Sequence, residues 1–146
     1  MGTPTMARIL VAEDDLLVAD TVQTMLRSGG HEVVLANRGD EAIRLFREQT
    51  FELVLCDVHM PGKDGLEVID EIRQSSPHIP VVSMTGSYPR ASGGAHLDPA
   101  FLKASKKVGA TKVLAKPFRA HELLAIVRDC LGEASAAVVQ LPSGDS

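Results

Sequence analysis

The sequence predicts an α/β fold in which a five-stranded parallel sheet is covered by helices on both faces. Short, nearly unbroken runs of β-branched and aliphatic residues alternate along the chain with segments whose apolar residues recur at helical spacing. Continuous apolar runs are typical of parallel strands buried on both faces, and right-handed crossovers place the intervening helices on alternate sides of the sheet. The chain has 146 residues, which is the size of one domain.

The expected elements follow one another in a regular order. Each strand is assigned from an aliphatic run and each helix from apolar residues three or four positions apart. Gly29 and Gly30 indicate a helix end, whereas Asp98 followed by Pro99 indicates a helix start. In order, we predict a strand at 8–12, a helix at 16–28, a strand at 31–36, a helix at 40–48, a strand at 53–56, a helix from 66 past 72, a strand at 80–84, a helix from about 101, a strand at 112–115 and a helix at 120–131.

Two segments depart from this regular pattern. Residues 87–97 have no helical period and contain Pro89, Gly93 and Gly94, so we predict a long loop, and loops of this length are more often functional than incidental. Residues 132–146 are small or polar and include Gly and Pro, so we predict a flexible C-terminal tail after a domain spanning 7–131. That tail is too short for an output domain.

Composition narrows the class of protein. With 15 Lys and Arg against 19 Asp and Glu, the net charge is −4, which argues against a nucleic-acid partner. Two cysteines do not make a disulfide framework, and no apolar run approaches the roughly 20 residues of a membrane span. The first six residues lack the charge and apolar core of a secretory signal. We therefore expect a cytoplasmic protein that binds no membrane, as a monomer or weak homodimer.

Polar residues end four of the five predicted strands. Glu13 and Asp14 follow the first strand and Asp57 the third, while Thr85 and Lys116 end the fourth and fifth. In an open α/β sheet the ligand crevice lies at the carboxyl ends of the strands, so we expect these side chains to share one site. The second strand ends in Ala36-Asn37, which places it at an edge of the sheet, away from that site.

Carboxylates from neighbouring strands repel one another, and a divalent cation removes the conflict. Any one of these acidic residues could instead cap the following helix or lie in solvent. Asp15 is assigned to a helix start, because negative charge is favourable there. An all-oxygen ligand set favours Mg²⁺, with Mn²⁺ possible, over Zn²⁺. A carboxylate beside Mg²⁺ can attack phosphorus to give an aspartyl phosphate, with a Lys ammonium and a Thr hydroxyl contacting the phosphoryl oxygens.

Four segments then carry a family resemblance. The segments RILVAEDD (8–15), VLCDVHMPGKDG (54–65), PVVSMTG (80–86) and LAKPF (114–118) resemble, in order, the motifs of the CheY-like response-regulator receiver domain of two-component signalling. The resemblance covers roughly residues 7–131. It implies a flavodoxin-like sheet with strand order 2-1-3-4-5, and a cis peptide bond between Lys116 and Pro117.

The resemblance also implies a role for each site residue. Asp57 would be the phosphoacceptor. Asp14, Asp57 and the backbone carbonyl of His59 would bind Mg²⁺ directly, with Glu13 acting mainly through water. Thr85 and Lys116 would contact the phosphoryl group. The donor would be a histidine kinase or a histidine phosphotransfer protein, and an unknown downstream protein would read the surface around strand four, helix four, strand five and helix five.

Two departures from the family pattern stand out. Val113 occupies the position three before the lysine, which is usually aromatic, so the usual rotating ring is missing. Thr85 and Lys116 are also 31 residues apart, several more than is typical, and the extra residues fall in the predicted loop with Tyr88. We predict that phosphorylation acts chiefly by reordering this loop and the fourth helix.

Two rival functions remain at this stage. A Mg²⁺-dependent phosphohydrolase also uses an Asp nucleophile, but it carries a second Asp two residues later, where this sequence has His59. A nucleotide-binding module requires a Gly-rich turn after the first strand, where this sequence has an acidic run. We therefore expect no enzyme, only self-phosphorylation from phosphodonors and slow autodephosphorylation. The histidines His59 and His96 are expected to be exposed loop residues and no metal pair.

Overall fold

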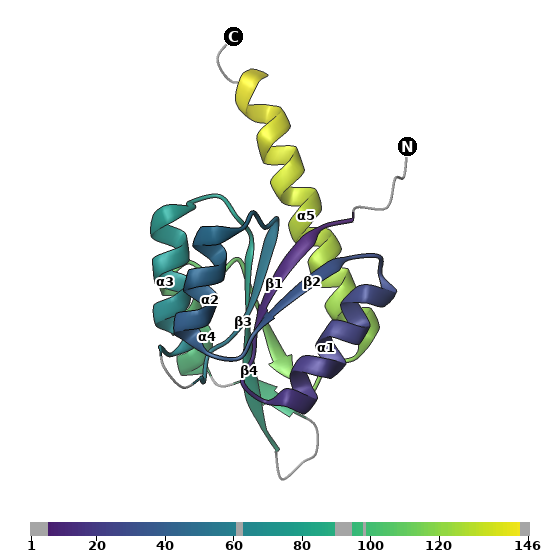
Figure 1. The fold of residues 1–146 in the computed structure, drawn as a ribbon, viewed down its shortest axis with the longest axis vertical. Helices are drawn as coiled ribbons and strands as arrows, with labels where there is room; N and C mark the ends of the chain where they lie inside the picture. Colours follow the sequence, from purple (N-terminus) through teal and green to yellow (C-terminus); the bar gives the residue numbers. More distant parts are fainter. Residues whose placement is uncertain (1–5, 61–62, 90–94, 98, 144–146) are drawn as a thin grey trace.

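Five parallel strands form the sheet, in the spatial order β2-β1-β3-β4-β6 (Figure 1). The computed structural model describes residues 6–60, 63–89, 95–97 and 99–143. The parallel strands are β1 (Arg8–Ala12), β2 (Glu32–Ala36), β3 (Leu53–Asp57), β4 (Val81–Pro89) and β6 (Lys112–Lys116). The predicted α/β class and the 2-1-3-4-5 order of the parallel strands are confirmed, with β6 as the fifth of them.

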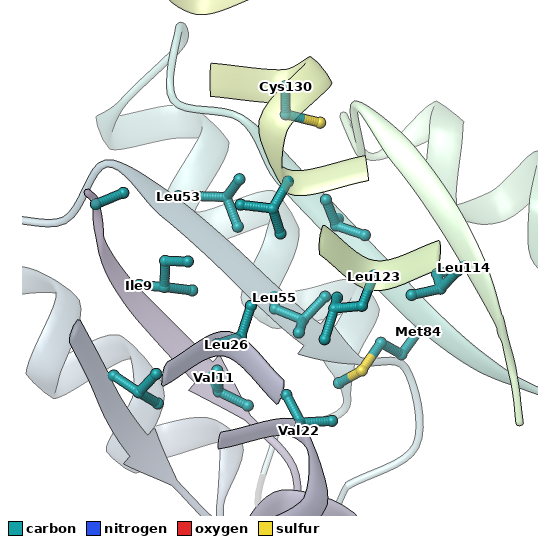
Figure 2. Close-up of a cluster of buried hydrophobic side chains, with 14 of the residues drawn as sticks. Ile9, Val11, Val22, Leu26, Leu53, Leu55, Met84, Leu114, Leu123 and Cys130 are labelled. Carbon is teal, nitrogen blue, oxygen red and sulfur yellow. The ribbon is translucent and has the colours of Figure 1, made fainter. Parts of the chain in front are cut away.

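Helices cover both faces of the sheet, as Figure 1 shows. On one face lie α1 (Leu16–Ser28) and α5 (Ala120–Ser143), and on the other lie α2 (Gly39–Glu48), α3 (Gly65–Ser75) and α4 (Pro99–Lys107). The core under α1 and α5 is aliphatic: Leu55, Met84 and Leu123, drawn in Figure 2, are fully buried. Burying each such side chain contributes about 1.5–3 kcal/mol, so this core is stabilised mainly by aliphatic side chains.

The segment predicted as a loop at 87–97 contains regular structure at both of its ends. Strand β4 continues to Pro89, five residues beyond the predicted end, and β5 (Ala95–Leu97) pairs with it in antiparallel orientation. The loop prediction was wrong there because a search for helical period cannot detect a hairpin, whose pairing is between strands. Residues 90–94 and 98 lie outside the described part of the chain, and so does the side chain of Tyr88.

The last helix is longer than predicted. It runs to Ser143, twelve residues past Leu131, and its final turns project beyond the sheet in Figure 1. The sequence interpretation ended this helix at Leu131 and predicted a flexible tail for 132–146 from its small and polar residues, but helical structure continues through 132–143. Gly costs only about 1 kcal/mol inside a helix, and the alanine-rich residues that follow have high helix propensity.

Strand register brings the predicted site residues together at one edge of the sheet. Ala12 at the end of β1 pairs with Cys56 of β3, so Glu13 and Asp57 follow side by side. Asp57 in turn pairs with Met84 of β4. The β2 strand lies at the outer edge beyond β1, as its ending in Ala36-Asn37 predicted.

Candidate phosphoacceptor and metal site

Three carboxylates converge at the carboxyl end of the sheet. Glu13, Asp14 and Asp57 each offer an oxygen, and these oxygens lie within 4.8 Å of one another. Glu13 and Asp57 are almost completely buried, with 1% and 4% of their surface exposed, whereas Asp14 is exposed. The cluster is therefore a half-open acidic pocket that is accessible from the side of Asp14.

Lys116 from the end of β6 lies between the two buried carboxylates. Its Nζ is 2.7 Å from Oε1 of Glu13 and 3.3 Å from Oδ2 of Asp57. One ammonium cannot neutralise three carboxylates, so the pocket keeps a net negative charge. Lys116 lies 103 positions from Glu13 in the sequence, and only the parallel register of β4 with β6 brings it to the pocket.

The protonation of the pocket reflects burial and mutual charge. Burial raises the pKa of the Glu13 carboxyl and the charge of Asp57 raises it further, although the hydrogen bond from Lys116 opposes both effects. Burial alone would lower the pKa of Lys116, but the hydrogen bond to Glu13 and the charges of Asp57 and Glu13 outweigh it and raise that pKa. Lys116 is therefore a permanent cation in this pocket.

The donor set fits a hard divalent cation. All of the clustered ligand atoms are carboxylate oxygens, the ligands that Mg²⁺ and Mn²⁺ prefer. Both oxygens of Glu13 already accept hydrogen bonds, one from Lys116 and the other from the backbone N–H of Asp15 at 3.1 Å. Asp14, whose side chain is exposed, is thus better placed than Glu13 to bind an ion directly.

His59 and Thr85, the remaining predicted site residues, flank this pocket. The backbone N–H of His59 donates to Oδ1 of Asp57 at 3.3 Å, so the two residues share a tight turn. Thr85 is fully buried, one residue beyond the partner of Asp57 in β4, and its hydroxyl donates to the Gly86 carbonyl at 3.4 Å. Thr85 was predicted to end the fourth strand, but β4 continues to Pro89. The register pairs Gly86 with Lys116, so Thr85 and Lys116 lie at neighbouring positions on adjacent strands.

Asp15 belongs to the helix and not to the metal cluster. Its Oδ1 accepts hydrogen bonds from the backbone N–H groups of Leu17 and Val18, at 3.0 and 3.2 Å. This is the N-cap of α1, the role predicted for it. The Lys116–Pro117 peptide is cis, as the family resemblance implied.

The sequence interpretation missed Phe101 beside the pocket, and it did not show how closely Gly65 packs there. The ring of Phe101 in α4 lies against the ring of His59, with the centroids 4.6 Å apart and the planes at 89°. Gly65 begins α3 so close to the end of β3 that a Cβ there would lie 1.9 Å from the Asp57 carbonyl oxygen. The motif contained Gly65, but nothing in the sequence indicated that Phe101 would contact His59.

Comparison with known proteins identifies the family. Residues 9–128 match the model of the response regulator receiver domain. This chain belongs to that family. The match covers all of the pocket residues, and receiver domains are the signalling phosphoacceptor domains of two-component response regulators.

Individual relatives agree with this assignment. Over 92% of its length the receiver domain is 35% identical to the transcriptional regulatory protein ZraR of Escherichia coli, and over 87% it is 36% identical to the response regulator protein FleR of Pseudomonas aeruginosa. It spans only 29% and 25% of those two proteins. A CheY-like receiver domain from Methanospirillum hungatei superposes with a TM-score of 0.80 over 91% of this chain and 99% of its own, at 23% identity, which shows the shared fold.

None of the helices in the described ranges has the length and apolar character needed to cross a bilayer.

Proposed function

We propose that this receiver domain accepts a phosphoryl group on Asp57 from a histidine kinase or a histidine phosphotransfer protein, in a Mg²⁺-dependent reaction. The observation that carries the proposal is the pairing of a buried Asp57 with Lys116 inside an acidic cluster, at the carboxyl ends of β1, β3 and β6. A phosphohydrolase is less well supported, because its second Asp is replaced by His59, whose ring lies against Phe101.

The transfer is a substitution at phosphorus. An Asp57 carboxylate oxygen attacks, an O–P bond forms, and the P–N bond of the donor's phosphohistidine breaks with its electron pair leaving on the imidazole nitrogen. The Lys116 ammonium, 3.3 Å from Oδ2 of Asp57, balances charge on the phosphoryl oxygens, and the Thr85 hydroxyl donates to another of them. Autodephosphorylation of the product by water is expected to be slow.

Asp14, Asp57 and the His59 carbonyl would hold the cation, with Glu13 acting through water. When bound, Mg²⁺ or Mn²⁺ offsets the negative charge of the carboxylates and of the incoming phosphoryl group. The desolvated Glu13 carboxylate, whose pKa is raised by burial and by Asp57, supports the need for such a cation.

A groove beside Lys116 supports a protein as the phosphodonor. It has a volume of about 490 Å³ and is lined by residues of α1, by Gly86, and by Lys116 with the two residues that follow it. Leu17, which lines the groove, and its neighbour Leu16 are 76% and 73% exposed. Apolar side chains this exposed beside a reactive carboxylate suit docking of an amphipathic helical donor. Leu17→Ser should therefore slow transfer from a phosphotransfer protein and leave transfer from a small phosphodonor unchanged.

The output surface is proposed to be β4, α4, β6 and α5. Val113 in β6 has no ring to rotate, so another element must switch between two arrangements. The segment after Thr85 begins at the pocket and leads into α4. Hydrogen exchange with and without the phosphoryl mimic beryllofluoride tests this: protection should change most at residues 86–105, and a uniform change would contradict it.

The decisive experiment is intact mass after incubation with Mg²⁺ and acetyl phosphate. We expect a single added phosphate on the wild type, none in EDTA and none on Asp57→Asn. Incorporation at an unchanged rate in EDTA or in the variant would refute the mechanism. A phosphohydrolase would instead release phosphate over many turnovers without holding it. The cytoplasmic location and the absence of nucleic-acid binding remain predictions.

A further inference from the structure

His59 makes two different contacts that connect distant parts of the fold. Its backbone N–H donates to Oδ1 of Asp57, at the pocket. Its imidazole lies edge-on to the ring of Phe101, the third residue of α4, with a centroid separation of 4.6 Å and an interplanar angle of 89°. This T-shaped arrangement is a preferred geometry for aromatic pairs. One residue therefore touches the phosphoacceptor with its backbone and α4 with its side chain.

The packing of α4 makes this ring contact important. Among the described side chains of α4, only that of Ser105 is fully buried, and its hydroxyl has no hydrogen-bond partner. Phe101 and Leu102 are half-buried, and Lys103 is exposed. A helix with so little buried apolar surface has low local stability. Elements that move in signalling are generally among the less stable parts of a fold. The Phe101 ring links the start of α4 to the pocket through His59.

We propose that Phe101 is a positioning residue for the phosphoacceptor site and acts through the ring of His59. The ring contact restricts the His59 side chain and, with it, the orientation of the His59 backbone, whose N–H binds Asp57 and whose carbonyl is a proposed metal ligand. By thermodynamic reciprocity, ligand binding at the pocket must then bias the position of α4. This pair takes the place of the missing aromatic residue at Val113. The inference rests on the proposed function, because the His59 carbonyl is a ligand only if the pocket binds the cation.

The first test is Mg²⁺ affinity measured by isothermal titration calorimetry. Phe101→Leu keeps the apolar bulk but removes the ring, and should weaken Mg²⁺ binding about two- to tenfold, the range expected for one aromatic pair. Phe101→Tyr keeps the ring and should bind like the wild type. Lys103→Ala, on the exposed side of the same helix, is the matched control and should leave the affinity unchanged.

A double-mutant cycle separates positioning from general loosening of α4. His59→Ala retains the backbone carbonyl but loses the ring, so it should lose as much affinity as Phe101→Leu. The double variant should lose no more than either single variant, because both changes remove the same contact. Wild-type affinity in Phe101→Leu, or losses that multiply in the double variant, would overturn the proposal. Urea unfolding of each variant shows whether a loss of affinity reflects loss of the fold.

The second test reads the reciprocal effect. With Mg²⁺ and beryllofluoride, hydrogen exchange at residues 99–107 should slow in the wild type and in Phe101→Tyr, but much less in His59→Ala. An undiminished response in His59→Ala would contradict the link. These outcomes are distinct from failure of the proposed function, since a wild type that gains no phosphate on Asp57 refutes that function whatever the affinities of the Phe101 variants are.

Discussion

Replacement of Gly65 by alanine should damage both stability and the pocket. Gly65 is the first residue of α3, and its N–H donates to the Val58 carbonyl at 3.0 Å. A Cβ at this position would lie 1.9 Å from the Asp57 carbonyl oxygen and 2.4 Å from the Val58 Cα. Both neighbours are backbone atoms, so no side chain can rotate away, and the start of α3 must move.

The size of the effect follows from these distances. Ordinary contact begins near 3.4 Å, so the gap must open by about 1.5 Å (3.4 − 1.9). Overpacking of this kind costs about 1–3 kcal/mol, and loss of the Gly65–Val58 hydrogen bond about 1 kcal/mol more. The lower entropy of the unfolded alanine chain offsets about 0.4–1 kcal/mol, because the φ of Gly65 is one that alanine can adopt. We expect a net loss of about 1–3.5 kcal/mol in the free energy of unfolding.

The assay is urea unfolding followed by circular dichroism, since the chain contains no tryptophan for fluorescence. Mg²⁺ titration of the same variant should show weaker binding, because Asp57 lies at the site of the clash. Gly132→Ala is the matched control: no atom lies within 4 Å of its Cβ, and Ala is favoured inside a helix, so stability should rise by up to about 1 kcal/mol. If Gly65→Ala is as stable as Gly132→Ala and binds Mg²⁺ like the wild type, the steric argument is wrong.

Three further predictions concern charge. Lys116→Ala should bind Mg²⁺ more tightly than the wild type, because it removes an ammonium 2.7 Å from Glu13. The same variant should lose the phosphorylation-dependent spectral shifts. Weaker Mg²⁺ binding would contradict the argument from charge. Asp14→Ala should weaken Mg²⁺ binding more than Glu13→Ala, since both Glu13 oxygens already accept hydrogen bonds, and equal losses by calorimetry would remove the distinction. His31 accepts a backbone hydrogen bond on Nδ1, and burial lowers its pKa below 6.5. As the pH falls, His31 is therefore protonated in the unfolded chain before it is protonated in the folded protein. The stability that His31 contributes above about pH 6.5 is lost as the pH falls toward its pKa in the folded protein. His31→Gln should flatten the dependence of the free energy of unfolding on pH between about pH 7.5 and 5.

Much of the pocket could be predicted from the sequence because parallel strands share an orientation. Each apolar run ends where its strand leaves the sheet, so the residues directly after those runs meet at one edge. Glu13, Asp57 and Lys116 satisfy this rule, and the structure places their side chains within hydrogen-bonding or ion-pairing distance. The cation site was predicted from the same rule, because carboxylates that end neighbouring strands repel one another unless a cation lies between them.

What the sequence could not predict depends on contacts between elements. The pairing of β5 with β4 has no helical period in the sequence by which it could be recognised. The extension of α5 depends on whether a single residue, Gly132, interrupts an otherwise favourable helix. The contact of Phe101 with His59 joins residues 42 positions apart through the packing of α4, which has no local signature. These features arise from tertiary structure, which overrides local propensity.

Three separate strands supply the charged pocket, and this has a consequence for folding. Glu13 follows β1, Asp57 ends β3 and Lys116 ends β6, and β4 lies between the last two strands. The pocket requires four of the five parallel strands, β1, β3, β4 and β6, so a bound cation or phosphoryl mimic stabilises only a domain in which these strands are assembled. A ligand at 100 times its dissociation constant adds about 2.7 kcal/mol to the free energy of global unfolding. A bound cation or phosphoryl mimic should therefore also lengthen the lifetime of the protein against proteolysis, because the ligand-bound form opens completely less often than the ligand-free form.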